Sequence, residues 1–219
     1  MQRKTAIWLM LVFLASGFAA LLYQVVWQRS LFAIYGINIE SVTVVVTAFM
    51  LGLGFGSFAG GAVSKDPKRP ALLLFALVEL SIGAFGLVSL PLFHWVGAFT
   101  LNLSPIATAL VTFLLVLFPT MLMGGTLPLL VAYFVRKNGN VGKSVGALYF
   151  VNTLGSAIAS IASVMVMMGP LGELNTVRAA AAVNAVVGLG ALSLHMRERR
   201  VPARVSAPAP APAPMAEAE

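Results

Sequence analysis

The chain has 219 residues, of which 59% are hydrophobic and only 10% are charged, whereas about 25% of the residues in a soluble domain are charged. A soluble fold of this size could not bury so much apolar surface, so the composition predicts an integral membrane protein. The net charge of +7 lies in short loops between apolar runs, which favours an anionic membrane surface over nucleic acid as a partner, and the lack of cysteine excludes a disulfide framework, a cysteine metal site and thiol catalysis.

Six apolar runs are long enough to cross a bilayer as helices, since about 20 residues suffice. They cover residues 6–26, 41–63, 71–93, 106–134, 145–168 and 175–194. The first run is too long for a signal peptide and has no small-x-small cleavage site, so we expect a retained span. Its helix can continue to Tyr35, because Gly36 opens the first strong breaker. The third run is expected to end at His94 and Trp95, near the membrane surface.

The second run carries glycine at every fourth residue, at Gly52, Gly56 and Gly60. In water each glycine would destabilise a helix by about 1 kcal/mol relative to alanine. In lipid, rows of small residues let two helices approach closely, so this row predicts a helix-packing surface. It does not predict a nucleotide site, since no strand precedes it and its spacing does not fit a phosphate-binding turn.

The fourth run is longer than a bilayer requires, and Pro119, Gly124, Gly125 and Pro128 interrupt it. Proline removes a backbone hydrogen bond from a helix and its ring clashes with the preceding turn. We therefore expect the fourth helix to be kinked or partly broken.

The fifth run is expected to stop at Gly169-Pro170, and Asn175 has the side chain of an N-cap for the sixth. Beyond Arg204 the sequence alternates proline and alanine, which can neither bury a core nor hold a helix. Residues 201–219 are therefore predicted to form a disordered, extended cytoplasmic tail. This tail is either a solvated end or a docking segment for a partner.

Lysine and arginine predict the orientation of the spans. Twelve of the fourteen fall in the termini and in alternate loops, namely Arg3, Lys4, Lys65, Lys68, Arg69, Arg136, Lys137, Lys143, Arg197, Arg199, Arg200 and Arg204. The other two, Arg29 and Arg178, fall in the remaining loops. Since cytoplasmic loops carry the excess of Lys and Arg, both ends of the chain are expected in the cytoplasm.

Polar residues of four predicted helices share one level of the bilayer. Counting 1.5 Å per residue from the cytoplasmic ends places them roughly 9 to 12 Å deep. They are Ser57, Glu79, Thr126 and Asn152, with Tyr149 slightly shallower and Asn184 deeper. An ionisable group such as Glu79 is costly at this depth and often marks an ion or substrate path. The alternative is a neutral, hydrogen-bonded glutamate that ties the third helix to the fourth and fifth.

Aromatic and basic residues gather at the far end of the first helix, at Tyr23, Trp27 and Arg29. They are interpreted as an aromatic belt at the membrane surface, with the arginine extending outward. His94 and His195 are too isolated to indicate a metal site, and no cofactor is expected.

Five segments, taken in their order along the chain, together carry a resemblance to a known protein family. They are residues 17–29 (GFAALLYQVVWQR), 48–57 (AFMLGLGFGS), 119–128 (PTMLMGGTLP), 148–155 (LYFVNTLG) and 169–172 (GPLG). Together they resemble the N-terminal membrane region of the fused, spermidine-synthase-like membrane proteins of bacteria. The residues of this pattern that we single out are Tyr23, Gln24, Trp27, Arg29, Gly124 and Pro128. The resemblance covers about residues 17–190 and implies a multi-pass protein of the bacterial cytoplasmic membrane.

In that family a cytoplasmic aminopropyltransferase domain usually follows the helices, with a nucleotide-binding glycine loop and catalytic aspartates. Here the residues after Leu194 contain neither glycine nor aspartate, so we expect no such domain and no catalytic residue. The membrane half of the family is also compared with half of a major-facilitator transporter. The basic loop after the second run resembles that superfamily's motif, although Asp66 comes one position late and Pro67 replaces a motif residue.

Two hypotheses from different classes follow. The first, which we favour, is a non-catalytic membrane subunit that anchors a separate cytoplasmic or membrane partner or forms a homo-oligomer. The second is a transporter, or a dimeric half-transporter, for polyamines or another small cation, with Glu79, Asn152 and Thr126 forming an inner-half site. An enzyme acting alone comes third, because the sequence offers no nucleophile with its base, no metal cluster and no paired carboxylates.

Overall fold

The computed structural model describes residues 3–37, 39–100 and 102–200, which are almost entirely helical. The helices are α1 (Arg3–Tyr35), α2 (Ile39–Ser64), α3 (Ala71–Thr100), α4 (Pro105–Asn138), α5 (Val141–Ala162), the π-helical segment η1 (Ser163–Leu171) and α6 (Gly172–Arg200). Five helices are long and apolar enough to cross a membrane, namely α1 to α4 and the continuous run Val141–Arg200. The all-α prediction is confirmed, with no strand among the described residues. The predicted tail, residues 201–219, lies outside them.

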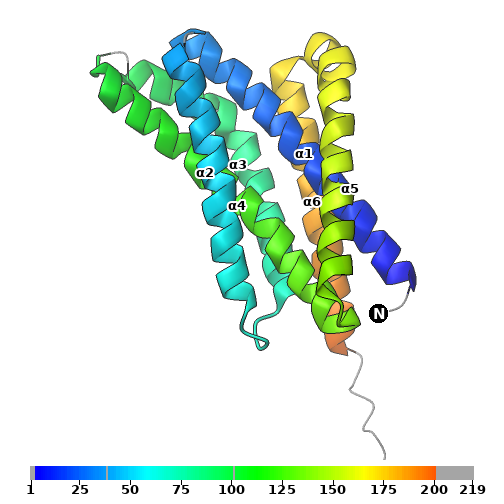
Figure 1. Ribbon diagram of the computed structural model, residues 1–219. Coiled ribbons are helices and arrows are strands. Elements are labelled where there is room, and N and C mark those ends of the chain that lie inside the picture. The colour runs from blue at the N-terminus through cyan, green and yellow to red at the C-terminus, as the bar shows by residue number, and fades with distance from the viewer. Residues whose placement is uncertain (1–2, 38, 101, 201–219) are drawn as a thin grey trace, which may run out of the picture.

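Successive helices run in opposite directions along the bundle (Figure 1). The pairs in closest contact are α2 with α4, α3 with α6, and α1 with α5. The start of α1, the end of α6 and the α2–α3 and α4–α5 connections lie at one end of the bundle (Figure 1), which we call the basic end. The α1–α2 and α3–α4 connections and η1 lie at the other end, which we call the opposite end.

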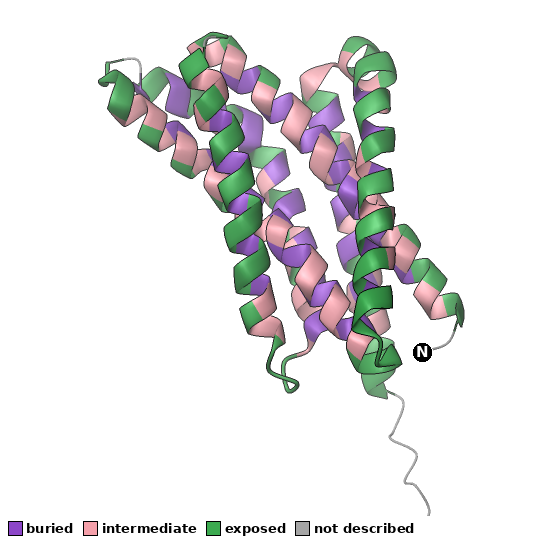
Figure 2. Ribbon diagram, viewed as in Figure 1, coloured by how far each residue is buried: buried purple, intermediate pink, exposed green. Residues whose placement is uncertain are grey.

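Buried residues lie toward the inside of the bundle, and exposed residues lie on its periphery (Figure 2). One core cluster packs around Trp27, with Phe49 and Phe93, and a second includes Phe13 and Phe75. Large apolar side chains remain exposed on every helix. Helices that are apolar all round are typical of membrane spans, so this periphery fits contact with lipid.

Local sequence signals explain several helix ends. Gly36 ends α1 with a φ of 85°, a conformation that costs glycine little. Ser104 caps α4 by accepting a hydrogen bond from the backbone N–H of Ala107, and Gly139 ends the same helix in the left-handed conformation. Asn140 then caps α5 through the N–H of Lys143. These caps end α4 and begin α5 within a short connection, across which the two helices run in opposite directions (Figure 1).

Two expected interruptions are absent. Helix α3 does not end at His94 and Trp95 but continues to Thr100, and α4 is one helix that contains both Pro119 and Pro128. The Thr120 hydroxyl lies 2.9 Å from the carbonyl oxygens of two residues in the preceding turn. The carbonyl that Pro119 leaves without its backbone donor is that of Leu115, so these contacts do not replace the lost bond. The partly broken fourth helix was a wrong expectation, whereas the kink stays a prediction.

The fifth and sixth predicted helices meet differently from expectation. Helical structure continues past Gly169-Pro170 as η1, so the expected stop is wrong. The reversal occurs at Gly172, whose φ of 71° again suits glycine. Asn175 is not the N-cap, because it lies inside the first turn of α6 and donates from Nδ2 to the carbonyl of Leu171 at 3.1 Å.

Candidate functional site

The predicted glycine row of α2 lies directly against α4. All three glycines are buried, and a Cβ at Gly60 would lie 2.7 Å from the carbonyl oxygen of Gly125. A Cβ at Gly56 would overlap the backbone of Met121, and the same holds in reverse for Gly124 against Leu53. The two backbones therefore touch, as small-residue rows allow in membranes.

Glu79 lies fully buried between three helices. Its Oε1 accepts a hydrogen bond from the hydroxyl of Ser16 on α1 at 2.5 Å, and its Oε2 accepts one from Nδ2 of Asn184 on α6 at 2.6 Å. A glycine one turn later on α3, Gly83, makes room for this approach, since its Cβ would lie 3.2 Å from that of Asn184. The carboxyl group thus ties α3 to α1 and α6, and the expected ties to the fourth and fifth helices are wrong.

The partners of Glu79 are neutral. The ion pairs among the described residues are Arg29 with Glu173, Arg69 with Asp66, and Lys137 with Glu198, so none involves this carboxyl group. An unpaired charge in a low-dielectric interior is costly, and both oxygens are instead satisfied by a hydroxyl and an amide. Chemically, the cluster can hold helices together or hold a proton.

Two atoms beside this cluster lack a hydrogen-bond partner among the described residues. They are the Tyr23 hydroxyl and Oδ1 of Asn184, both buried. Tyr23 follows Ser16 by two turns of α1 and packs on Gly86, which follows Glu79 by two turns of α3. The buried polar groups therefore extend along one interface.

Among the described residues, side-chain hydrogen bonds join α1 to α3 at three places along this interface, including the bond of Glu79 already described. From the basic end to the opposite end, the pairs are Ser16 with Glu79, Trp27 with Ser89, and Tyr35 with Thr100. Polar side chains that bond across helices stabilise membrane bundles by about 1 kcal/mol each. The α1–α3 interface is thus held by polar bonds over most of its length.

Tyr23 and Trp27 of α1 belong to the core and not to a surface belt. Trp27 is completely buried, donates from Nε1 to the Ser89 hydroxyl at 2.9 Å, and stacks on Tyr23 with ring centroids 5.0 Å apart. Gln24 is half-buried. Arg29 does extend outward, where it pairs with Glu173 of α6 at 3.0 Å.

The remaining predicted site residues are not brought together. Asn152 donates from Nδ2 to the backbone carbonyl of Phe13 at 3.3 Å. Thr126 is buried and donates to a carbonyl of its own helix, while Ser57 and Tyr149 lie exposed on the outer faces. Depth counted along the sequence gave no information on rotation about each helix axis, which decides whether residues at one level meet.

Sequence reasoning missed the actual partners of Glu79. Asn184 was placed deeper than the polar level, and Ser16 was not singled out. Serine in an apolar run has no distinguishing signal, since its hydroxyl often bonds within its own helix. Pro128 is half-buried in α4, with no polar role evident.

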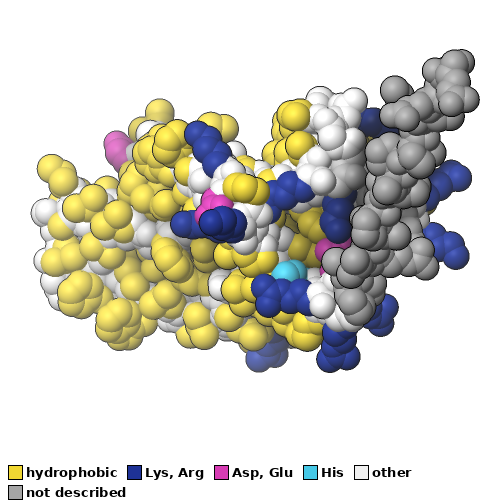
Figure 3. All heavy atoms as spheres, turned by 90° about the horizontal axis from the view of Figure 1, so that it is seen from below, with side chains coloured by type: hydrophobic (Ala, Val, Ile, Leu, Met, Phe, Trp, Pro, Cys, Tyr) yellow, Lys and Arg dark blue, Asp and Glu magenta, His cyan; other side chains and the backbone are white. Residues whose placement is uncertain are grey.

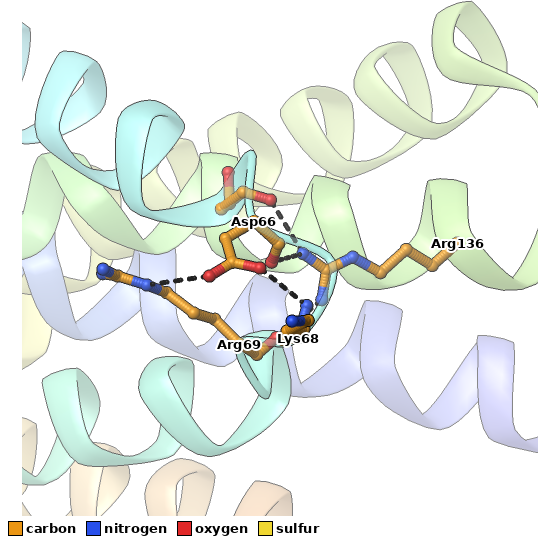
Figure 4. A network of polar contacts seen from close by, with 5 residues as sticks. Asp66, Lys68, Arg69 and Arg136 are labelled. Atoms are coloured by element: carbon orange, nitrogen blue, oxygen red, sulfur yellow. Dashed lines mark hydrogen bonds and ion pairs between the residues drawn. The ribbon is translucent and has the colours of Figure 1, made fainter.

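A second polar network fixes the connection between α2 and α3 at the basic end (Figure 4). The guanidinium of Arg136, on α4, donates to the carbonyl oxygens of Ser64, Asp66 and Arg69 at 2.7 to 2.9 Å. The carboxylate of Asp66 accepts from the backbone N–H of Lys68 at 2.9 Å and lies 3.6 Å from Nε of Arg69. One arginine thus holds a whole basic loop in shape.

The end of α6 is attached to α4 in a similar way. Glu198 accepts a hydrogen bond from the Tyr133 hydroxyl at 2.8 Å and pairs with Lys137 at 3.1 Å. Many Lys and Arg side chains are visible when the molecule is viewed from this end (Figure 3). The basic end therefore presents an ordered, strongly cationic surface.

No family model, curated protein or solved structure matches the sequence. Among the described residues no group of three or more His, Cys, Asp or Glu side chains could hold a metal ion. The function is therefore argued from the polar interior, the basic end and the cavities of the bundle.

Proposed function

We propose that the chain crosses the bacterial cytoplasmic membrane six times, with the basic end in the cytoplasm. Sixty residues, Val141–Arg200, would extend about 90 Å as one straight helix, about three times the hydrocarbon thickness. Because the chain reverses at Gly172, α5 and α6 count as two crossings in this proposal. The excess of Lys and Arg at the basic end supports its cytoplasmic position.

We also propose that the chain is related to the spermidine-synthase-like membrane proteins. The segments that carry this resemblance lie at helix contacts: Tyr23 and Trp27 pack between α1 and α3, and Gly124 touches α2. A pattern concentrated at packing positions supports a shared bundle and implies no shared catalysis.

Within that bundle, the function we propose is that of a non-catalytic membrane subunit that anchors a cytoplasmic protein partner at its basic end. The observation that carries this proposal is the loop held by Arg136 (Figure 4), which keeps exposed Lys65 and Lys68 in a fixed arrangement. A cationic surface that is ordered in advance loses less entropy on binding and is complementary to an acidic surface.

Co-purification from mild detergent at native expression tests the proposal. The intact protein should bring a partner with it, and the double variant Lys65→Gln/Lys68→Gln should lose most of that partner. Arg178→Gln, a basic residue of α6 outside the basic end, is the matched control and should retain it. A monodisperse chain without a partner contradicts the proposal, and so does equal loss in both variants.

A transporter is the second candidate, and the unpaired Tyr23 hydroxyl and Asn184 Oδ1 beside Glu79 favour it. Buried polar groups with spare bonding capacity in a membrane interior mark ion or substrate paths. In this alternative two copies form the path for a polyamine or another small cation. Uptake of a labelled polyamine into proteoliposomes tests it: absence of uptake removes the transporter, and uptake unchanged by Glu79→Gln removes Glu79 from the path.

A further inference from the structure

A cavity of about 550 Å³ opens at the opposite end of the bundle, between the end of α1, the start of α2, the end of α3 and the start of α4. It lies about five helical turns from Glu79, since Gly97 and Thr100 of α3 line it. It is also remote from the loop held by Arg136. Neither the proposed anchoring surface nor the Glu79 cluster accounts for it.

The polar part of the cavity wall consists of hydroxyl groups and one carboxylate. They belong to Tyr35, Ser41, Thr100, Thr108 and Thr112 and to Glu40, which is exposed. No lysine, arginine or histidine lines this cavity among the described residues. The wall therefore carries net negative charge when Glu40 is ionised.

The hydrogen bonds already made in the wall decide which bonding capacity remains. The Thr100 hydroxyl donates its one proton to carbonyls of its own helix, at 2.9 and 3.0 Å. Either oxygen could donate in the contact of 3.0 Å between Tyr35 and Thr100, and Tyr35 is the donor when the Thr100 proton is directed to its own helix. The Thr108 hydroxyl likewise donates to the carbonyl of Thr100. Both Tyr35 and Thr108 are left as acceptors.

Thr112 adds an independent observation. Its side chain is only 4% exposed, and its hydroxyl has no hydrogen-bond partner among the described residues. Leaving a buried hydroxyl unpaired is unfavourable by about 1–3 kcal/mol. A ligand that donates a hydrogen bond within the cavity would recover this loss.

We infer that this cavity binds a small organic cation, a primary ammonium group on a short apolar body. A primary ammonium group has three N–H donors and no acceptor. It can therefore donate hydrogen bonds to the acceptor oxygens and to the carboxylate of the cavity wall. The rest of the wall is apolar, with Leu31, Phe32 and Val45 among its side chains, and suits a hydrocarbon body. The inference does not depend on the proposed partner at the basic end.

The absence of cysteine from the sequence permits a direct test with single-cysteine variants of the purified protein. Thr112→Cys places a thiol in the cavity wall, and Ile37→Cys, 81% exposed at the same end, is the control outside it. The probes are 2-aminoethyl methanethiosulfonate, a small primary ammonium, and the anionic 2-sulfonatoethyl analogue. The measurement is the labelling rate with each reagent.

Relative to the control, Thr112→Cys should prefer the cationic reagent by about tenfold, the effect of one charge-assisted hydrogen bond. n-Butylammonium should slow this labelling, and butyrate should not. Adding Glu40→Gln should remove most of the preference, whereas Glu173→Gln, at the same end but outside the cavity, should keep it. If Thr112→Cys fails to fold, Thr108→Cys carries the same expectations.

Equal reactivity toward both reagents after normalisation would overturn the inference. Protection by butyrate as strong as protection by n-butylammonium would also overturn it, because the cavity would then select apolar bodies and not cations. Failure of all cavity thiols to react would show a site closed to small cations.

Discussion

At the scale of single residues, the carboxyl group of Glu79 is the only described acidic side chain that is completely buried, and it holds three helices through neutral donors. Glu79→Ala leaves Ser16 and Asn184 without their acceptor and opens a cavity, so we expect a loss of about 3–5 kcal/mol of unfolding free energy. Glu79→Gln should lose only about 1 kcal/mol, because the amide of Asn184 can rotate to accept from the new one. Thermal unfolding in detergent measures both.

The control for this prediction is Thr126→Val. That hydroxyl bonds only within its own helix, so its loss should change stability by less than about 1 kcal/mol. A loss as large as that of Glu79→Ala would show that any buried polar substitution destabilises this bundle equally, and the role given to Glu79 would be wrong.

The Trp27–Ser89 pair allows a second prediction at this scale. Ser89→Ala leaves the buried indole N–H without an acceptor, which should lower stability by about 1–3 kcal/mol. In the double-mutant cycle with Trp27→Phe, the two losses should not add, with a coupling energy of about 0.5–1.5 kcal/mol. Additive losses would mean that the bond at 2.9 Å contributes nothing beyond packing.

At the scale of helices, the glycines of α2 differ sharply in what surrounds them. A Cβ at Gly56 would overlap the α4 backbone, whereas one at Gly54 would meet nothing within 4 Å. Gly56→Ala should therefore push α2 away from α4 and cost about 1–3 kcal/mol, while Gly54→Ala should stabilise α2 by up to about 1 kcal/mol through helix propensity. Unfolding curves of the two variants in one detergent should move in opposite directions.

The loop held by Arg136 gives a further prediction about elements. Two nitrogens of the Arg136 guanidinium span the three carbonyl oxygens. Lysine has the charge of arginine but carries its donors on a single nitrogen and lacks the planar fork, so Arg136→Lys should not reproduce this arrangement. Hydrogen exchange of the loop amides, those of Lys65, Asp66, Lys68 and Arg69, should become faster in this variant. Lys137→Gln, one residue away and paired with Glu198 instead, is the control and should leave the loop unchanged. Unchanged exchange in Arg136→Lys would contradict the network.

These elements also show what the sequence could predict. The spacing of Gly52, Gly56 and Gly60 is a property of the sequence and identified the face that packs on α4. The partners of Glu79 depend on how α1 and α6 rotate and tilt against α3, which no local pattern encodes. For the same reason Trp27, placed in a surface belt from its position near a helix end, lies instead in the core.

At the scale of the whole molecule, the number of crossings follows from which side each connection faces. In the native membrane, single cysteines at Ile37 and at Leu171, both exposed at the opposite end, should react with a membrane-impermeant maleimide added to intact cells. Cysteines replacing Lys65 and Asn138, at the basic end, should react only after the cells are opened. The parent chain contributes no background, because it has no cysteine.

The residue that decides the proposed topology is Leu171, between η1 and α6. If α5 and α6 are two crossings, the thiols at Ile37 and Leu171 face the same side, and the N- and C-terminal ends of the described chain face the other. If Val141–Arg200 crossed only once, one of its ends would lie on the side opposite to the basic loops. The arginines at the end of α6, Arg197, Arg199 and Arg200, would then lie outside the cytoplasm, against the positive-inside rule. Labelling at Leu171 only after cell opening, with labelling at Ile37 from outside, would place Leu171 on the cytoplasmic side and rule out six crossings.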